Sequence, residues 1–314
     1  MTQTRRRFIS RIAAALGLAA LSPKIGLGQE VSQSKTRLIL LGTGGGPRPR
    51  ANSFASSQVI IINGAPYVVD CGDGVATQLV RAGVRLASIR DVLITHHHSD
   101  HNADYGNLLL LAWTAGLETR VDTWGPPPLK KINRLFFEMS DVDIRTRIAD
   151  EGRSPIAPLI HPHEIVSGGP VFKDEHVTVT CAVVQHPMIK TALAYRFDTR
   201  DRSIVISGDT AKSDALIALA KGADVLVHEA MYLPGVDRLA ARAKNATTIK
   251  KHFLASHTSA EDAGRVAAAA GVKTLVLSHF VPADDPQITE QMWRDSAKTT
   301  FSGQIIVGRD LLEI

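Results

Sequence analysis

Short apolar segments alternate with longer amphipathic segments along most of the chain. The apolar segments are rich in Val, Ile and Leu, and many of them stop at Gly, Asp or Asn, which is typical of buried β-strands. We expect strands at residues 37–43, 57–63, 67–70, 92–95, 177–185, 192–197, 204–207, 225–227, 274–277 and 305–307.

The segments between these strands carry the signals of helices. The clearest helix is expected at residues 260–270, because Ser259 is an N-cap candidate and Gly271 stands just past its end. The other helices are expected at residues 75–82, 105–115, 129–137, 214–220 and 287–300. Since no linker separates two halves, the pattern predicts one α/β domain of mixed layers over residues 29–314.

The first 28 residues have the composition of a secretory signal. Arginines at positions 5–7 precede Phe8, an apolar run covers residues 12–21, and small residues follow up to position 28. The paired arginines resemble a twin-arginine address, which predicts export to the periplasm by the twin-arginine machinery. The apolar run is about half of the roughly 20 residues that a membrane-spanning helix needs, so we expect no stable membrane anchor.

The positive charge of the chain lies in this N-terminal segment. The formal net charge is +5, and residues 1–28 hold five basic residues and no acidic one. Residues 29–314 hold 31 basic and 31 acidic residues, so their net charge is close to zero. Nucleic-acid binding depends on neutralising phosphates with basic side chains, and a neutral body therefore predicts no nucleic-acid partner.

The strongest chemical signal is a cluster of histidines and one aspartate directly after the strand expected at residues 92–95. Its pattern, His-x-His-x-Asp-His, is formed by His96, His98, Asp100 and His101. Residues two apart on an extended segment point to the same side, so His96 and His98 can bind one ion. The following turn directs Asp100 and His101 toward a second ion. Imidazole and carboxylate ligands without thiolates suit zinc at an open, catalytic site.

Motifs on both sides of this cluster occur in the order typical of the metallo-β-lactamase-fold hydrolases, and the chain resembles that family. The motifs are Leu-Gly-Thr-Gly-Gly at 41–45, Asp-Cys-Gly-Asp-Gly at 70–74, Gln-His-Pro at 185–187, Ser-Gly-Asp-Thr at 207–210 and Leu-Ser-His-Phe at 277–280. The resemblance spans nearly all of residues 29–314. It implies the family's fold, an αββα four-layer sandwich.

The resemblance also implies a set of metal ligands. The implied ligands are, for one zinc ion, His96, His98 and His186, and, for a second zinc ion, Asp100, His101 and His279. Asp209 would bridge the two ions. Asp70 would orient a ligand histidine, and the alternative is an aspartate that only caps a turn. A hydroxide held between the ions would attack the substrate, with Asp100 orienting it.

Two late motifs favour the branch of the family that contains RNase Z and arylsulfatase-like enzymes. Val-His-Glu-Ala-Met-Tyr at 227–232 resembles its His-Glu-Ala-Thr loop, and Ser-His-Thr-Ser at 256–259 resembles its His-Ser-Thr loop. By this resemblance His257 contacts the charged group of the substrate or protonates the leaving group. His228 and Glu229 either meet the substrate or shape the loop, and the sequence leaves both roles open.

The chain departs from RNase Z between the helical motif and the third histidine. RNase Z proteins usually grip tRNA there with a long, Gly-rich and basic arm, whereas residues 126–169 hold no dense basic cluster. With export and a neutral body, this favours an exported dinuclear zinc hydrolase that uses a bridging hydroxide on a small molecule. The substrate would be a sulfate, phosphate or carboxylic ester, a lactone, or an activated aromatic halide. The alternatives are an RNase Z-like phosphodiesterase acting on nucleotides or RNA, and a non-catalytic zinc-binding protein, and a homodimer stays open.

Overall fold

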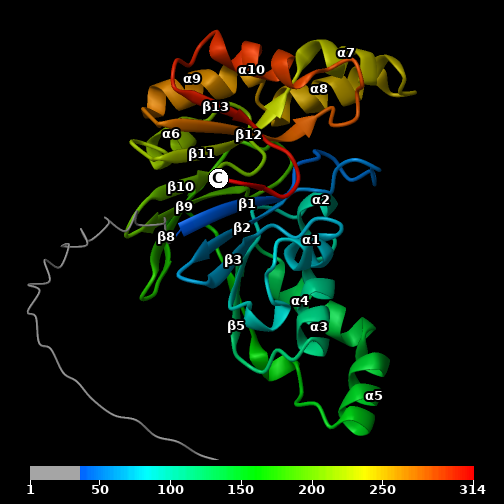
Figure 1. Cartoon of the computed structure of the whole chain (residues 1–314). Coiled ribbons are helices and arrows are strands. Elements are labelled where there is room, and N and C mark those ends of the chain that lie inside the picture. Colours follow the sequence, from blue (N-terminus) through cyan, green and yellow to red (C-terminus); the bar gives the residue numbers. More distant parts are fainter. Residues whose placement is uncertain (1–35) are drawn as a thin grey trace, which may run out of the picture. The chain divides into compact units, whose positions relative to one another are not determined.

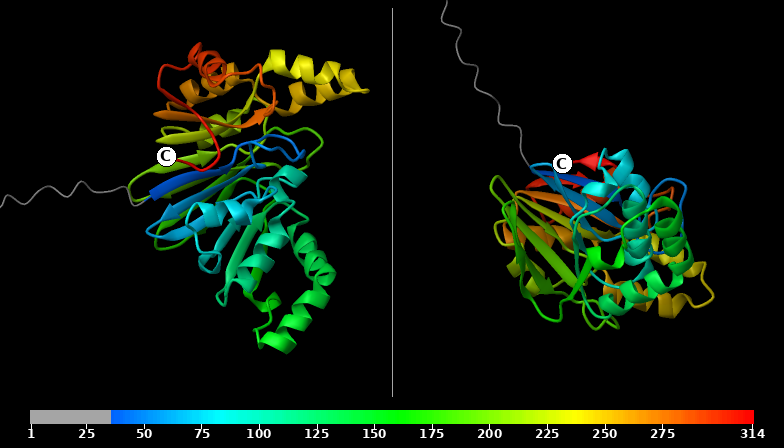
Figure 2. Two further views of the ribbon diagram at one scale, coloured as in Figure 1. Left: turned by 45° about the vertical axis from the view of Figure 1, so that its right-hand side comes forward. Right: turned by 90° about the horizontal axis from the view of Figure 1, so that it is seen from below.

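The computed structural model describes residues 36–314, which form two seven-stranded β-sheets packed face to face (Figure 1). The signal predicted at residues 1–28 and its boundary with the predicted domain at 29–314 lie outside the described residues. Helices cover the outer face of each sheet, which gives the four layers of an αββα sandwich (Figure 2). The fold class predicted from the sequence is therefore confirmed. Among the described residues, no helix is both long and apolar enough to cross a membrane.

The first sheet has the strand order β14-β1-β2-β3-β4-β5-β6. Antiparallel pairing joins β14, β1, β2 and β3, and parallel pairing continues from β3 to β6. The bounds are β1 Thr36–Gly42, β2 Ser57–Ile62, β3 Ala65–Val69, β4 Asp91–Leu93, β5 Val121–Gly125, β6 Ile160–Glu164 and β14 Leu312–Glu313.

The second sheet has the strand order β13-β12-β11-β10-β9-β8-β7. Strands β7 to β10 pair antiparallel, and strands β10 to β13 pair parallel. The bounds are β7 Gly169–Lys173, β8 Val177–Val183, β9 Leu193–Thr199, β10 Ser203–Ile206, β11 Val225–Met231, β12 Thr274–Val281 and β13 Gln304–Val307.

The helices fall into two outer layers and one separate hairpin. The layer on the first sheet contains α1 Val75–Arg81, α3 Tyr105–Thr114, α4 Leu129–Met139 and α5 Asp141–Glu151. The layer on the second sheet contains α6 Asp214–Leu219, α9 Ala260–Ala270 and α10 Glu290–Lys298. Helices α7 Leu233–Ala241 and α8 Ala246–Ser256 pack against each other as a hairpin, drawn in yellow at the upper right of Figure 1. The short elements are α2 Ser99–Asn102, η1 Leu86–Ser88 and η2 Ala157–Leu159.

Three apolar layers hold the sandwich together. The layer between the two sheets contains Tyr195 and Phe197, both fully buried. The layer under α9 is built from alanines such as Ala263 and Ala267, whose small side chains let the helix lie close to β11 and β12. Burial of apolar surface is the main driving force for this arrangement, because each layer removes aliphatic and aromatic side chains from water.

The structure confirms some of the expected elements and differs from others. Helix α9 matches its prediction at 260–270, and Oγ of Ser259 caps it by accepting a hydrogen bond from the backbone N of Asp262 at 3.0 Å. The helix expected at 287–300 starts later, at Glu290, because Thr289 caps it. Helices α2, α5, α7 and α8 and strands β5, β6, β7 and β14 were not among the elements expected from the sequence.

Candidate metal centre and active site

The histidine cluster follows strand β4, and Asp70 at the end of β3 fixes its backbone. Oδ1 of Asp70 accepts a hydrogen bond from the backbone N of Thr95 at 2.7 Å. Oδ2 of Asp70 accepts one from Nδ1 of His101 at 2.8 Å. Because Nδ1 of His101 is engaged in this way, its Nε2 is the nitrogen left to face the site.

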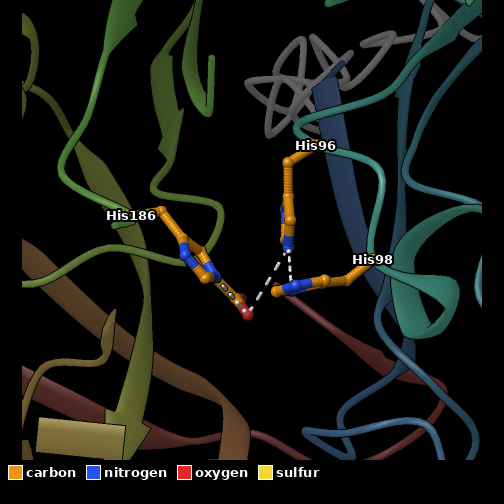
Figure 3. A group of neighbouring side chains, drawn as sticks. His96, His98 and His186 are labelled. Atoms are coloured by element: carbon orange, nitrogen blue, oxygen red, sulfur yellow. Dashed lines mark hydrogen bonds and ion pairs between the residues drawn. The ribbon is translucent and has the colours of Figure 1, made fainter. Parts of the chain in front are cut away.

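Four side chains form the first group of potential metal ligands, and three of them are labelled in Figure 3. Nε2 of His96 lies 3.1 Å from Nδ1 of His98 and 3.8 Å from Oδ2 of Asp209. Nε2 of His186, from the loop after β8, lies 4.0 Å from the same oxygen. The ligand atoms of this group all lie within 4.8 Å of one another, which suits four atoms around one ion.

A second group of four adjoins the first and shares Asp209 with it. Nε2 of His279, at the end of β12, lies 3.2 Å from Oδ2 of Asp100 and 3.2 Å from Oδ1 of Asp209. Nε2 of His101 lies 3.2 Å from Oδ1 of Asp209 as well. The structure thus brings together all seven residues that the resemblance implied as metal ligands.

Asp209 faces the two groups with different oxygens. Its Oδ2 is directed to His96 and His186, and its Oδ1 to His101 and His279. Gly208 precedes it with a φ of 58°, and a Cβ at that glycine would lie 2.7 Å from the backbone O of Leu193. The tight turn therefore requires glycine, and it places the carboxylate between the two histidine groups.

The chemistry of these side chains fits bound cations. Nε2 of His101, Nε2 of His186 and Oδ1 of Asp209 are buried without a hydrogen-bond partner among the described residues. Such buried polar atoms are rare in folded proteins and need a partner of another kind. Burial lowers the pKa of His186 to about 4, and burial together with His101 holds the pKa of His96 well below its usual range. These imidazoles are therefore neutral near pH 7, which is the form that binds a metal.

Glu229 and His257 lie beside the metal ligands. Oε2 of Glu229 lies 2.7 Å from Nδ1 of His257, and Nδ1 of His257 lies 3.9 Å from Oδ2 of Asp209. Burial, reinforced by the charge of Asp209, raises the pKa of Glu229 well above its usual range. Since Nδ1 of His257 is engaged by Glu229, its Nε2 is the atom available to a bound substrate.

A glycine loop closes the other side of the centre. The backbone N of Gly46 donates a hydrogen bond to Oδ2 of Asp100 at 2.7 Å. A Cβ at Gly45 would lie 2.8 Å from the ring of His279, so this glycine allows the loop to contact the ligand. The guanidinium of Arg50 donates to the backbone O of Gly45 and of Gly46, which holds the loop in place. The sequence signalled this loop by its Leu-Gly-Thr-Gly-Gly motif at 41–45, but not its contacts with Asp100 and His279.

A cavity of about 400 Å³ opens onto these residues. Its polar floor contains His98, Asp100, Asp209 and His257. The α7–α8 hairpin supplies a largely apolar wall, and arginines stand on the side of the glycine loop. The lining residues that the sequence did not single out include Arg48, Arg50, Leu239, Ile249, His252, Phe253 and Pro282. A concave, mostly apolar site with a few polar groups at its floor is typical of a substrate pocket.

Two other histidines near the motifs have different surroundings. His228 is fully buried, and its Nδ1 lies 2.8 Å from the backbone O of Glu229. It neither lines the cavity nor belongs to a group of potential ligands among the described residues. Nε2 of His97 is hydrogen-bonded at 2.7 Å to the backbone O of Pro126, so this ring is turned away from its neighbours His96 and His98.

The chain matches the family model described as the beta-lactamase superfamily domain over residues 66–280. The chain belongs to the metallo-β-lactamase superfamily. Together with the ligand groups described above, this makes the protein a metal-dependent hydrolase of that superfamily.

Relatives with known names lie within the same superfamily. A ribonuclease Z of Mycobacterium bovis (strain BCG / Pasteur 1173P2) is 34% identical over 277 residues, which cover 87% of this chain and 96% of the relative. Among solved structures, the metallo-β-lactamase fold protein YhfI from Bacillus subtilis superposes with a TM-score of 0.65 at 22% identity, covering 89% of this chain and 98% of its own. Human tRNase Z, short form, superposes with a TM-score of 0.64 at 21% identity, covering 88% and 98%.

These relatives overturn two expectations from the sequence. A small ester-like molecule was the expected substrate, and no nucleic acid was expected. The named relatives, however, are ribonucleases Z, and their similarity extends over most of this chain. The expectation rested on a net charge close to zero for residues 29–314. Net charge is a sum over the whole surface, and it does not describe the local charge beside an active site. The alternative of an RNase Z-like phosphodiesterase is the better supported reading.

Proposed function

We propose that the protein is a phosphodiesterase that cleaves RNA, with two zinc ions bound at the centre described above. The observation that carries the proposal is the position of Asp209, whose two oxygens face two separate groups of ligands. The similarity to a ribonuclease Z over 277 residues supports RNA as the substrate class. Nitrogen and carboxylate donors without thiolate favour zinc.

The two ions would be held by His96, His98 and His186 on one side, by Asp100, His101 and His279 on the other, and by Asp209 between them. When bound, a pair of dications lowers the pKa of water and balances the charge of a phosphodiester at both the attacking and the leaving oxygen. A diester fits such a pair well, because charge changes at both of these oxygens during the displacement.

The side chains around the cavity supply orientation and proton transfer. Asp100 lines the cavity, and its Oδ2 is fixed by the backbone N of Gly46, so it can orient the attacking water. His257 also lines the cavity, with Nδ1 held by Glu229. Its Nε2 is therefore placed to donate a proton to the leaving oxygen of the nucleotide. Asp70 acts through His101, whose ring it orients.

The proposal is tested by incubating the zinc-loaded protein with a single-stranded RNA and, separately, with a chromogenic phosphodiester, a carboxylic ester and a sulfate ester. We expect cleavage of the RNA and of the phosphodiester, and loss of both activities in Asp209→Ala. Hydrolysis of the carboxylic or sulfate ester without any cleavage of RNA or phosphodiester would refute it.

Export remains a proposal of its own, supported by the arginines at positions 5–7 and the apolar run at 12–21. Replacing Arg5 and Arg6 with Lys should leave the precursor inside the cell if the twin-arginine machinery carries the protein to the periplasm. Undiminished export of that variant would argue for another route.

A further inference from the structure

The α7–α8 hairpin, residues 233–256, carries a strong positive charge beside the active site. It holds five basic residues, Arg238, Arg242, Lys244, Lys250 and Lys251, and one acidic residue, Asp237. The rest of residues 29–314 holds 26 basic and 30 acidic residues. The near-zero net charge of the body therefore conceals a basic hairpin on an otherwise acidic protein.

The opposite end of the molecule shows no such excess. The helices α4 and α5, residues 129–151, lie within residues 126–169, which hold no dense basic cluster. They contain five basic and five acidic residues. Many of these pair within the helices, as Arg147 does with Asp143 and Glu151 at 3.0 and 2.8 Å. The α7–α8 hairpin, rather than α4 and α5, therefore attracts a polyanion electrostatically.

The cavity at the metal centre continues along helix α7. A second cavity of about 330 Å³ adjoins the first. The two cavities share five of their lining residues, which are Arg48, Leu239, Ile249, Pro282 and Asp284. The second cavity is also lined by Arg238 and Arg242. The two cavities form one groove that leads from the metal ligands toward the turn between α7 and α8.

The cations along this groove differ in how they are paired. Arg48 lies 3.2 Å from Asp284, and Arg238 lies 2.6 Å from Asp285. Arg242, which lines the groove, and Lys244, which follows the lining residue Ala243, are both exposed and form no ion pair with any residue in the part of the chain that the structure describes. Unpaired, exposed cations attract phosphates without first breaking an existing ion pair.

Rings lie at the end of the groove nearest the metal ligands. Phe253 and His252 both line the first cavity, and their ring centroids lie 5.7 Å apart. Aromatic faces next to basic side chains are the features with which proteins hold single-stranded nucleic acids, since bases stack on the rings and phosphates meet the cations.

We propose that the RNA strand on one side of the scissile phosphate follows this groove along α7, with its phosphates on Arg242 and Lys244 and a base against Phe253. The inference rests on the proposed function, and it names the surface that holds the substrate. Contacts to phosphates carry no sequence information, so the groove binds single-stranded RNA of any sequence.

The test compares two double variants on the same hairpin. Arg242→Gln with Lys244→Gln removes the unpaired cation that lines the groove and the unpaired cation two residues after it, in the turn between α7 and α8. Lys250→Gln with Lys251→Gln removes the same charge from the other groove of the hairpin, where both lysines lie and where Lys250 is paired with Asp237 at 2.6 Å. Binding of the zinc-loaded protein to a labelled single-stranded RNA is measured by fluorescence anisotropy at several salt concentrations, early enough that little of the strand is cleaved.

We expect the first double variant to raise the Kd for RNA by about tenfold, and to reduce the slope of log K against log salt by about 1.4, since each single-strand phosphate contact contributes about 0.7. We expect the second double variant to change the Kd by less than about twofold, because salt screens the electrostatic effect of these lysines beyond roughly 8 Å at physiological salt. The thermal unfolding midpoint of each double variant, compared with that of the wild-type protein, reports that both variants are folded.

The outcomes separate this inference from the proposed function. If both double variants weaken RNA binding equally, or if neither weakens it, the proposed groove is wrong, whether or not RNA is cleaved. Weakening by the first variant alone supports the groove even if the wild-type protein binds RNA without cleaving it, in which case the proposed function fails and the binding surface stands. If the wild-type protein does not bind RNA, the groove is refuted.

Discussion

Oε2 of Glu229 lies 2.7 Å from Nδ1 of His257, although 28 residues separate them in the chain. The other oxygen of the same carboxylate, Oε1, accepts a hydrogen bond from the backbone N of Thr210 at 2.6 Å, next to Asp209. One buried carboxylate thus connects the proposed proton donor with the turn that carries Asp209. This link explains how residues from β11, from the loop after β10 and from the end of α8 keep a fixed geometry.

His257→Ala should lower kcat for RNA and for the small phosphodiester by about 10²- to 10⁴-fold, because it removes a positioned proton donor. Bound zinc should stay the same, since the ring is not among the seven proposed ligands. Kinetics and metal analysis of the same sample check both parts. Unchanged kcat in this variant would leave His257 with a structural role only.

Asp209→Ala should release most of the bound zinc, because it withdraws one oxygen from each group of ligands. Mass spectrometry for metals after dialysis measures the loss. Asp198→Ala, which removes a carboxylate from the surface of β9, is the control and should keep its zinc. Two zinc ions per chain in Asp209→Ala would contradict the bridging position.

Asp70→Asn should weaken zinc binding by about 10- to 100-fold without removing a ligand. Asparagine can still accept from the backbone N of Thr95 through its oxygen, but its amide nitrogen cannot accept from Nδ1 of His101. Competition with a chromogenic chelator measures the affinity. A zinc affinity equal to that of the wild-type protein would show that Asp70 only caps the turn and does not orient His101.

Gly45→Ala should reduce activity by about 10²-fold, because the new Cβ would lie 2.8 Å from the ring of His279 and from the backbone O of Phe280. The loop or the histidine has to move, and either movement disturbs the ligand. Activity at saturating zinc together with thermal unfolding checks this, and a variant of wild-type activity would show that the contact is not needed.

The contribution of Asp91 to the stability of the protein should fall as the pH rises from about 4 to about 6. Burial raises the pKa of this carboxyl to about 6, whereas an unfolded aspartate titrates near about 3.9. The folded state therefore binds a proton more tightly than the unfolded state, and its stabilisation is present at low pH and lost as pH passes through about 6. Asp91→Asn keeps an oxygen to accept from Nε1 of Trp124 and removes the buried charge.

Urea unfolding of Asp91→Asn should accordingly show a gain of about 1 kcal/mol in the free energy of unfolding at neutral pH, and little or no gain near pH 4. A gain of the same size at both pH values would mean that the charge of Asp91 is not its cause.

The proposed metal ligands could be named from the sequence because they stand in short local motifs that follow strands, as His96 and His98 do after β4. The division of the two oxygens of Asp209 between two groups was not readable, since it depends on how the turn at Gly208 packs against β9. The same holds for the contact between Gly46 and Asp100, whose partners are 54 residues apart.

The walls of the cavity were harder to foresee than its floor. Helices α7 and α8 are short, with 9 and 11 residues, and Pro and Gly stand in the first turn of α7, so their pattern did not stand out as two helices. The positive charge of these two helices is balanced by acidic residues elsewhere in residues 29–314. The net charge was therefore close to zero, and it led to the wrong prediction that no nucleic acid is a partner. The local charge of a surface can be judged only when it is known which residues lie together, as Arg238 and Arg242 do along the groove.

The most direct test of the proposed two-zinc phosphodiesterase is a titration of the metal-free protein with zinc while the cleavage of a single-stranded RNA is followed. We predict no cleavage without metal and a rise in rate that reaches its plateau at two zinc ions per chain. Cleavage by the metal-free protein in the presence of a chelator, or no cleavage of RNA at any zinc content, would contradict the proposal.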